Sequence, residues 1–215
     1  MKYSSWPVVK LAIGDEEIAM EQDNGSMHVG TTVWPCSLVL AKWAERQGGI
    51  RERIQGKRGI ELGAGCGGAG LALALLGLGQ VLLTDVPPVL STLKRNVKKN
   101  VLATSLSSKK KVKVAQLNWG NKQQIESLKP PFDVVIAADV VYIENGVEPL
   151  LQTMGDVSGP DSLILLGYQV RSPEAHELFW RLCPERFAVD KVDRSQLHPD
   201  YAFEEADVYI LKKKC

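Results

Sequence analysis

The most informative stretch of this chain is residues 61–70, which read Glu61-Leu62-Gly63-Ala64-Gly65-Cys66-Gly67-Gly68-Ala69-Gly70. Glycine is required where a backbone turns with positive φ, or where a Cβ would keep a ligand away from the main chain. A strand-like apolar run precedes the stretch, a helix-like apolar run follows it, and the acid Asp85 lies shortly beyond. The first turn of a helix offers unpaired N–H groups to a carboxylate or a phosphate. The stretch therefore predicts a backbone cradle for an adenosine-containing ligand.

Strand and helix patterns alternate on both sides of this cradle. Strands are predicted at 59–62, 80–85, 111–117, 132–138, 162–168, 187–192 and 207–211, and helices at 69–76, from 87, at 147–154 and at 173–183. Strands that alternate with helices form a parallel sheet with right-handed crossovers and helices on both faces. No helix pattern separates the last two strands, so one of them is expected to run antiparallel. The fold class is therefore α/β.

The first fifty residues have a different pattern. Residues 8–20 suggest a β-hairpin that turns at Gly14-Asp15. A helix is predicted at 38–47, with Ser37 as a candidate N-cap. We expect residues 1–50 to form an extension that packs on a main domain of residues 51–215. Residues 102–110, rich in Ser and Lys, are the best candidate for a flexible loop.

Composition narrows the classes of protein. A length of 215 residues suits one domain with a sizeable core. The 26 basic and 25 acidic residues leave a net charge of +1, so charge gives no reason to expect a nucleic-acid partner. The basic residues at 94–99 are interpreted as a solvated helix face. Near-zero net charge and single-domain length favour a monomer.

The four cysteines show no Cys-x-x-Cys spacing and predict reduced thiols, with neither a disulfide frame nor a metal site. The most apolar stretch is interrupted by glycines and falls short of the roughly 18–20 apolar residues that a membrane span needs. The N-terminus lacks the apolar core of a signal peptide. We therefore expect a cytoplasmic protein, with the nucleus as the alternative, and no membrane partner.

Glycine spacing alone leaves the cofactor open. Gly63-x-Gly65-x-x-Gly68 matches the dinucleotide fingerprint, Asp85 stands where a ribose-binding acid is expected, and a glycine turn without any ligand also fits. A nicotinamide dehydrogenase normally needs a second nucleotide-binding half, which the roughly 130 residues after Asp85 would have to supply along with the rest of the sheet. Asp139 and Tyr142 follow the central strand, at the edge where such sheets bind ligands. Glu61, two residues before the first glycine, resembles the acid of the first motif of S-adenosylmethionine (SAM) methyltransferases. Together these three features favour SAM over NAD.

Five motifs make the resemblance to one family specific. They read Val33-Trp34-Pro35-x-Ser37, Glu61-Leu62-Gly63-Ala64-Gly65-x-Gly67, Leu82-Leu83-Thr84-Asp85, Leu117-Asn118-Trp119-Gly120 and Ala138-Asp139-Val140-Val141-Tyr142. In this order they resemble the seven-strand protein-lysine methyltransferases of methyltransferase-like family 16, over almost the whole chain. The resemblance implies a Rossmann-like methyltransferase fold, a mostly parallel sheet with an antiparallel last strand, and an N-terminal hairpin.

The resemblance also implies which residues bind SAM. The cofactor-binding residues would be Trp34, Glu61, Gly63, Ala64, Gly65, Asp85, Trp119 and Ala138. Glu61 would order the cradle near the methionine amino end, and the glycine loop would pass under methionine and ribose. Asp85 would accept hydrogen bonds from the ribose hydroxyls, Trp119 would flank the adenine, Ala138 would leave room for the ligand, and Trp34 would close the methionine side. Each tryptophan could instead be an ordinary core residue.

Asp139 and Tyr142 are the candidate catalytic residues. A lysine amine is almost wholly protonated at neutral pH, so the site must remove a proton and orient the lone pair. Asp139 would hold the amine and Tyr142 would line the acceptor channel; alternatively, Asp139 is only the cap of the next helix. Members of the family often carry Tyr-Glu-x-Arg where this chain has Tyr168-Gln169-Val170-Arg171. An amide therefore replaces the carboxylate at this position. The replacement puts the identity of the methyl acceptor in question, but it does not affect the assignment of SAM.

The predicted activity is SAM-dependent methylation of a lysine on a protein partner, of the chaperone or translation-factor type. Two alternatives share every cofactor residue. One is a methyltransferase for a small-molecule amine or a protein histidine, and the other is a SAM-binding adaptor that does not catalyse transfer.

Overall fold

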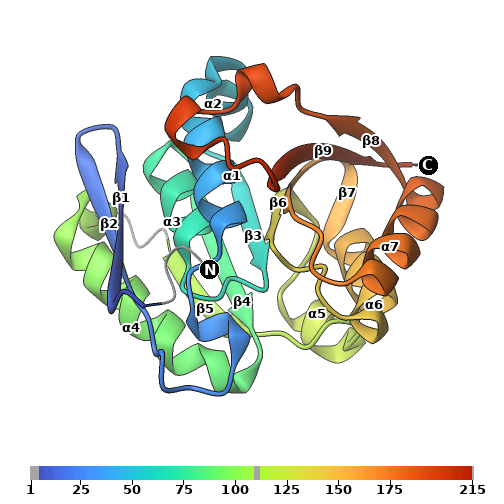
Figure 1. Cartoon of the computed structure of the whole chain (residues 1–215), viewed down its shortest axis with the longest axis horizontal. Coiled ribbons are helices and arrows are strands. Elements are labelled where there is room, and N and C mark those ends of the chain that lie inside the picture. Colours follow the sequence, from blue (N-terminus) through green and yellow to red (C-terminus); the bar gives the residue numbers. More distant parts are fainter. Residues whose placement is uncertain (1–4, 109–111, 215) are drawn as a thin grey trace.

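The computed structural model describes residues 5–108 and 112–214, and a seven-stranded sheet lies at its centre (Figure 1). The strand order is β5 (Val112–Gln116), β4 (Gln80–Asp85), β3 (Arg58–Leu62), β6 (Phe132–Ala138), β7 (Ser158–Tyr168), β9 (Asp207–Lys213) and β8 (Phe187–Lys191). The first five strands in this order are parallel, whereas β9 is antiparallel to both β7 and β8. The predicted α/β sheet with an antiparallel last strand is confirmed.

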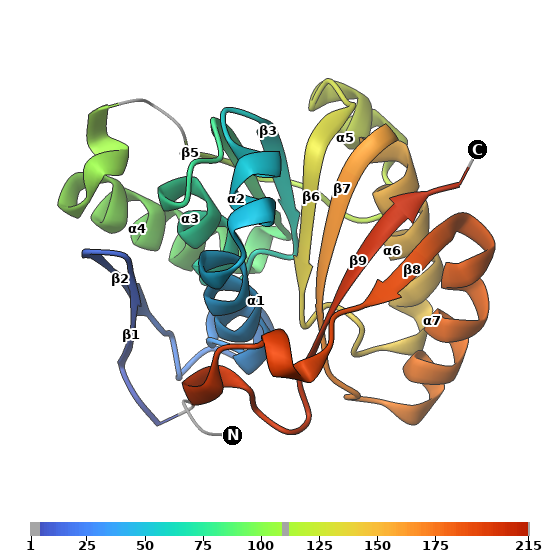
Figure 2. The same cartoon turned by 90° about the horizontal axis from the view of Figure 1, so that it is seen from above.

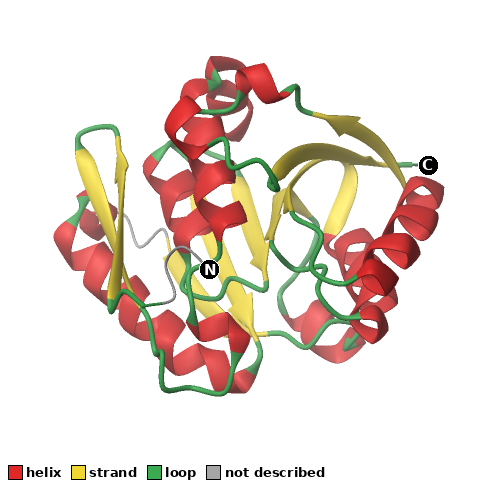
Figure 3. Cartoon of the chain, in the orientation of Figure 1, coloured by secondary structure: helices red, strands yellow, loops and turns green. Residues whose placement is uncertain are grey.

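Helices cover both faces of the sheet (Figure 3). One face carries α1 (Pro35–Arg46), α3 (Gly68–Leu75) and α4 (Pro87–Ala103). A short helix, α2 (Gly48–Ile54), follows α1. The other face carries α5 (Lys122–Ser127), α6 (Glu144–Val157) and α7 (Pro173–Arg186). Pro87 occupies the first turn of α4, where its missing N–H removes no helical hydrogen bond.

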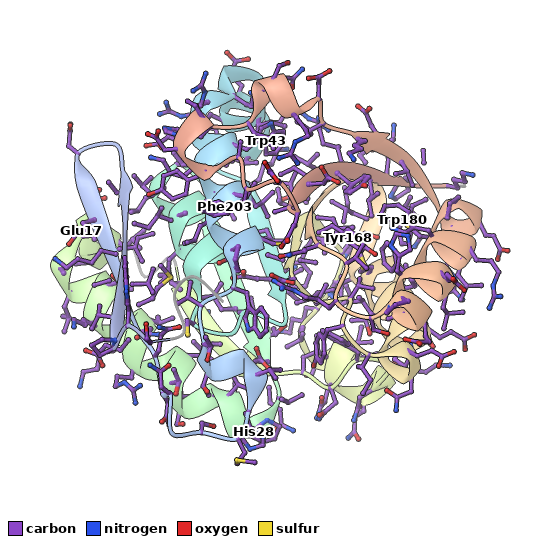
Figure 4. The ribbon with its side chains drawn as sticks, viewed as in Figure 1. Glu17, His28, Trp43, Tyr168, Trp180 and Phe203 are labelled. Carbon is purple, nitrogen blue, oxygen red and sulfur yellow. The ribbon has the colours of Figure 1, made fainter. Side chains whose placement is uncertain are left out.

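The central strand β6 separates two hydrophobic cores because its side chains alternate between the faces. Val134 and Ile136 belong to the core under α1 and α3, and Val135 and Ala137 to the core under α6 and α7. Each of these side chains is buried, as a near-continuous apolar strand predicts. Figure 4 shows Trp43 on the α1 side, with Tyr168 and Trp180 on the α7 side.

The parallel register aligns the carboxyl ends of the central strands. Leu62 at the end of β3 pairs with Thr84 of β4 and with Ala137 of β6. The glycine stretch, Asp85 and Asp139 therefore all leave the sheet at one edge, although the sequence separates them widely.

The N-terminal hairpin consists of β1 (Val8–Ile13) and β2 (Glu16–Glu21), and it turns at Gly14 as predicted. It packs over α4, as Figure 1 shows. Whether residues 1–50 form a unit separate from residues 51–215 stays a prediction. Helix α1, on the N-terminal side of that boundary, contacts α3, β7 and β9 directly.

Two asparagines of α4 join the hairpin to the main domain. The Asn100 amide accepts the N–H of Ala19 at 2.8 Å and donates to its carbonyl at 2.9 Å. One helical turn earlier, Asn96 makes the same pair of bonds to Glu21, both at 3.0 Å. These side chains hydrogen-bond the free edge of β2 as a neighbouring strand would.

The structure corrects two sequence predictions. Helix α1 begins at Pro35 with Trp34 as its N-cap, and Ser37, the predicted cap, lies inside the first turn. Proline at the first position fixes the helical φ, so the helix starts earlier; the Ser37 hydroxyl donates to the Trp34 carbonyl at 2.8 Å.

The predicted loop at 102–110 is partly helical. Helix α4 continues to Ala103, and a 3-10 helix follows at Ser105–Ser108. Burial of Leu106 explains this, since an anchored apolar side chain restricts the backbone around it. The rest of that predicted loop lies outside the described residues. Helices α2 and α5 were not predicted from the sequence.

Candidate functional site

A cavity of about 680 Å³ lies at the carboxyl edge of the sheet. Its walls come from the loop after β3, the ends of β4 and β6, and the segment that joins β2 to α1. Every residue assigned to the site from sequence lines this cavity: Trp34, Glu61, Gly63, Ala64, Gly65, Asp85, Trp119, Ala138, Asp139 and Tyr142. The sheet edge thus brings together the predicted donor and acceptor residues, and their individual roles stay predictions.

The floor of the cavity is the glycine loop, held by Asp85. The Asp85 carboxylate accepts the N–H of Gly65 at 2.7 Å through Oδ2 and the N–H of Val86 at 2.8 Å through Oδ1. Gly65 has φ +57°, and a Cβ there would lie 3.1 Å from the Gly30 carbonyl oxygen. Glycine is needed here for both the turn and the close approach of the two segments. Burial raises the pKa of Asp85, although the two N–H groups favour its charged form.

Glu61 lies behind the cradle and is only 1% exposed. Its Oε2 accepts the N–H of Gly70, in the first turn of α3, at 3.0 Å. Burial raises the pKa of Glu61 to about 8. A Cβ on Gly70 would lie 2.5 Å from Glu61 Oε2, so the last glycine of the stretch makes room for this carboxyl group.

Trp119 forms a wall over the start of the cradle. A Cβ on Gly63 would lie 3.1 Å from Trp119 Cζ2 and 3.0 Å from Val140 Cγ1, so the ring lies directly against the glycine backbone. The ring also packs partly against the core under α6. Trp119 is therefore both a core contact and a cavity wall, so the two interpretations of this residue are compatible.

Asp139 and Arg171 form an ion pair beside the cavity. Arg171 Nε donates to Asp139 Oδ1 at 2.8 Å, and Arg171 Nη2 donates to Oδ2 at 2.7 Å. The Asp139 side chain is 2% exposed, and its backbone is left-handed with φ 61°. Helix α6 begins after Ile143 without a side-chain cap, so Asp139 is not the cap of that helix. The arginine was quoted in a motif but not assigned to the site from sequence.

Trp34 contacts both the arginine and the N-terminal segment. The Arg171 guanidinium lies 4.5 Å from the centre of the Trp34 ring, a cation–π geometry. The indole N–H of Trp34 donates to the carbonyl of Val29 at 2.8 Å. Trp34 lines the cavity and is only partly buried, which excludes an ordinary core position.

Tyr142 is 44% exposed, far more than Asp139, the other residue predicted for the acceptor side. Burial of part of the side chain and the charge of Asp85 raise the pKa of its hydroxyl. The phenol therefore stays protonated at neutral pH. It is a neutral polar group where the cavity meets solvent.

The amide of Gln169 contacts a residue from another part of the chain. Its Nε2 donates to Glu205 Oε2 at 2.5 Å. Where the family pattern has a carboxylate, this chain therefore has an amide that binds a carboxylate from the turn before β9.

Sequence reasoning missed the roof of the cavity. The lining includes His28, Val29, Gly30, Thr32 and Val33, from the segment between the hairpin and α1. The first four carry no ligand-binding signal in their spacing, and Val33 was quoted in a motif without being assigned to the site. They reach the cavity because the hairpin is fixed to α4, a contact between distant parts of the sequence.

Among the described residues, Cys36, Cys66 and Cys183 are buried and free, and no cluster of potential metal ligands is found. No helix in residues 5–108 and 112–214 is long and apolar enough to cross a membrane.

Comparison with curated proteins gives similar sequences across nearly the whole chain. A family model described as "Lysine methyltransferase" matches residues 13–184. Protein N-lysine methyltransferase METTL21A of Mus musculus is 36% identical over 207 residues, which cover 96% of this chain and 87% of that protein. EEF1A lysine methyltransferase 3 of Xenopus tropicalis is 35% identical over 182 residues, which cover 84% of this chain and 76% of that protein.

Solved structures share the fold at low sequence identity. An rRNA methyltransferase from T. thermophilus, solved with AdoMet and guanosine, superposes with a TM-score of 0.64 at 19% identity, covering 96% of this chain and 50% of that chain. A TehB-like SAM-dependent methyltransferase from Corynebacterium glutamicum gives 0.56 at 20% identity, covering 81% and 87%.

Proposed function

The chain belongs to the lysine methyltransferase family and is a SAM-dependent protein-lysine N-methyltransferase, and we propose that the cavity at the carboxyl edge of its sheet is the site of methyl transfer. The observation that carries this proposal is the convergence of Asp85 and the Asp139–Arg171 pair on one cavity. One carboxylate suits the ribose of the donor, and the other suits the amine of the acceptor.

The cradle has the features that SAM requires. SAM supplies a methyl group on a positively charged sulfur. The Asp85 oxygens each accept one backbone N–H, and each retains a lone pair for a ribose hydroxyl. Gly63, Ala64 and Gly65 leave the backbone accessible, and Ala138 presents only a methyl group. The Trp119 ring is the apolar surface for the adenine.

The methionine end of the donor belongs beside Glu61 and Trp34. A positively charged ammonium near Glu61 would favour the ionised carboxylate and offset the effect of burial. Glu61 also fixes the first turn of α3 through the Gly70 N–H. Trp34 closes this side of the cavity, because its ring is held between Arg171 and the Val29 carbonyl.

Asp139, Arg171 and Tyr142 prepare the acceptor amine. Arg171 compensates the charge of Asp139, yet each carboxylate oxygen keeps a lone pair that can accept an amine N–H. A compensated pair stabilises an ammonium less than a free carboxylate does, so it suits the neutral amine that carries the reactive lone pair. Tyr142 lines the entrance. Placement of the lone pair supplies most of the rate enhancement in this displacement.

A labelling experiment tests the assignment of activity and site together. The protein is incubated with tritium-labelled SAM and a eukaryotic cell lysate, and labelled bands are identified by mass spectrometry. A methylated lysine in a discrete protein, absent with the Asp139→Asn variant, is expected. A label on histidine or on a small amine would change the acceptor assignment, and tight SAM binding without any label would indicate an adaptor.

The name of one relative supports a proposal for the substrate class. One curated relative is called an EEF1A lysine methyltransferase. We therefore propose a protein substrate of the translation-factor or chaperone type, with purified EEF1A as the first acceptor to test. The target lysine must be exposed in the folded substrate, because the Asp139–Arg171 pair lies below the protein surface.

We also propose that the protein acts as a monomer in the cytoplasm, without a nucleic-acid or membrane partner. The net charge of +1 and the free buried cysteines support this proposal. Light scattering during chromatography, with and without SAM, tests the oligomeric state.

A further inference from the structure

The turn before β9 reaches the same sheet edge as the cavity. Asp207, the first residue of β9, pairs with Tyr168, the last residue of β7. After Tyr168 the backbone continues to Arg171. Glu205 lies two residues before Asp207, so both residues are found just outside the same end of this strand pair. Figure 2 shows the segment between β8 and β9 beside α1, and the 3-10 helix η4 (Pro199–Tyr201) contacts α1. Glu205 therefore lies on the acceptor side of the sheet edge.

This turn is held rigidly. The Ala206 N–H donates to the Phe203 carbonyl at 3.0 Å, which makes Glu204 and Glu205 the two central residues of the turn. The Arg194 guanidinium donates to the carbonyls of Phe203 and Ala206 at 2.9 and 3.0 Å. Phe203 packs against the core and lies over α1 in Figure 4. The position of the two glutamates is thus fixed by the backbone.

Glu205 lies beside the cavity: its charge acts on Arg171, which lines the cavity, and its carboxylate binds Gln169. Gln169 is 9% exposed and donates its amide N–H to Glu205 Oε2, whereas Glu205 itself is exposed. Within the part of the chain that the structure describes, Glu205 Oε1 has no hydrogen-bond partner. One oxygen therefore holds the carboxylate in place, and the other belongs to an exposed side chain and is available to a cation.

The charges at this edge do not cancel. Asp139 pairs with Arg171, and Asp207 pairs with both Lys191 and Arg194. With Glu204 and Glu205 included, these side chains carry one negative charge in excess. Burial opposes the charge of Arg171, but the hydrogen bond and charge of Asp139, with a smaller effect of Glu205, raise its pKa overall. An acceptor lysine arrives as an ammonium with three N–H donors. The compensated Asp139–Arg171 pair attracts this charge weakly.

We propose that Glu205, held by Gln169, is the residue that receives the lysine ammonium at the entrance of the site and makes the enzyme select a cationic acceptor. The inference rests on the lysine methylation stated above and names the residue that recognises the acceptor. Glu205 acts before the chemical step, while the amine is still protonated. The ammonium then releases its proton to solvent water at the open entrance, where Tyr142 is 44% exposed, and Asp139 and Arg171 hold the neutral amine.

Binding of two matched peptides tests this proposal. The first is the peptide around the lysine that the wild-type protein methylates in the lysate experiment, and the second carries norleucine at that position. Norleucine keeps the apolar chain and lacks the ammonium. With the SAM product S-adenosylhomocysteine bound, the wild type should prefer the lysine peptide by about fivefold, the upper range for an exposed ion pair. Glu205→Gln should abolish this preference.

Two further variants separate recognition from folding. Glu204→Gln removes the same charge from the same turn and should leave the preference unchanged. The double variant Gln169→Glu/Glu205→Gln exchanges the acid and the amide across one hydrogen bond and should restore most of the preference. Kinetically, Glu205→Gln should raise KM for the lysine peptide about fivefold with kcat within about twofold, and high salt should reduce the difference from wild type.

The outcomes distinguish the two claims. A wild type that labels no lysine would overturn the proposed function and this inference together. A wild type that methylates lysine, with an unchanged peptide preference in Glu205→Gln, would overturn the inference alone. If Glu204→Gln loses as much of the preference for the lysine peptide as Glu205→Gln does, the inference is also overturned, because the effect would then reflect only the total charge of the turn.

Discussion

Arg171 donates one hydrogen bond to each carboxylate oxygen of Asp139, at 2.8 and 2.7 Å, so a residue after β7 fixes the carboxylate that follows β6. The same guanidinium lies over the ring of Trp34, the N-cap of α1. One arginine therefore connects the sheet edge to the N-terminal roof of the cavity. The geometry of the acceptor side depends on residues from three separate parts of the chain.

Substitutions at Asp139 should separate charge from backbone strain. Asparagine adopts the left-handed conformation readily, whereas alanine at φ 61° pays about 1 kcal/mol for it. We expect Asp139→Asn and Asp139→Ala to lower kcat by about 100-fold, the size of effect that misplacing a reacting group produces. Denaturant unfolding should find Asp139→Ala less stable than Asp139→Asn by at least about 1 kcal/mol. Transfer by Asp139→Asn at the wild-type rate would refute the assigned role.

Asp85→Asn should weaken SAM binding. The variant loses the charge and one acceptor oxygen, and hydrogen bonds to an ionised group contribute about 1.5–3 kcal/mol each. Calorimetry should show an increase in the Kd for SAM of at least about tenfold, with a smaller SAM-induced rise in Tm. Asp133→Asn is the matched control, since Asp133 accepts the N–H of Arg58 at 2.8 Å near the other end of β6. Equal SAM affinity in Asp85→Asn and wild type would contradict the ribose contact.

Gly70→Ala should destabilise the fold and disturb the cradle. The added Cβ would lie 2.2 Å from Leu83 Cδ2 and 2.5 Å from Glu61 Oε2, so both side chains must move. Overpacking of this kind costs about 1–3 kcal/mol, which chemical denaturation can measure. In Gly155→Ala, within α6, the Cβ meets nothing within 4 Å, so this variant should be more stable than wild type by up to about 1 kcal/mol. If Gly70→Ala has the same free energy of unfolding as the wild type, Glu61 is not tightly enclosed.

The ligand-free protein should lose stability as pH rises because of Glu61. Its pKa is about 8 in the folded protein, against an ordinary value of 4.5. Between these values the unfolded chain releases this proton while the folded protein keeps it, so the unfolding free energy falls with increasing pH. Denaturant melts at about pH 5.5, 6.5 and 7.5 should show this slope relative to Glu61→Gln, which cannot titrate. Parallel pH profiles of the two proteins would mean that Glu61 is ionised throughout.

The sheet was predictable because its central strand is unambiguous. A near-continuous apolar run such as residues 132–138 occurs where both faces of a strand are covered, and the glycine stretch marks the turn after β3. The short helices α2 and α5 escaped prediction, since six or seven residues carry too few turns for a clear periodicity. The start of α1 was misplaced because proline at the first position outweighs a nearby serine.

The site was predictable only on the side built from local sequence. The cradle, Asp85 and Asp139 follow directly from strand ends, whose common edge the fold class determines. The roof and Arg171 line the cavity through tertiary contacts, and Glu205 comes beside it in the same way, through the bond of Gln169 to a residue 36 positions away. No spacing of residues in the sequence predicts such a contact. The roof and the partners of the predicted acceptor residues were accordingly the parts that needed the structure.

The two asparagines of α4 have a consequence for solubility. Unpaired strand edges are the usual starting points for intermolecular sheet growth, and a two-stranded hairpin has two of them. Because Asn96 and Asn100 occupy the backbone groups of Ala19 and Glu21, strand β2 cannot recruit another molecule along those positions. Both amides therefore protect the enzyme against aggregation while they hold the roof-bearing segment in place.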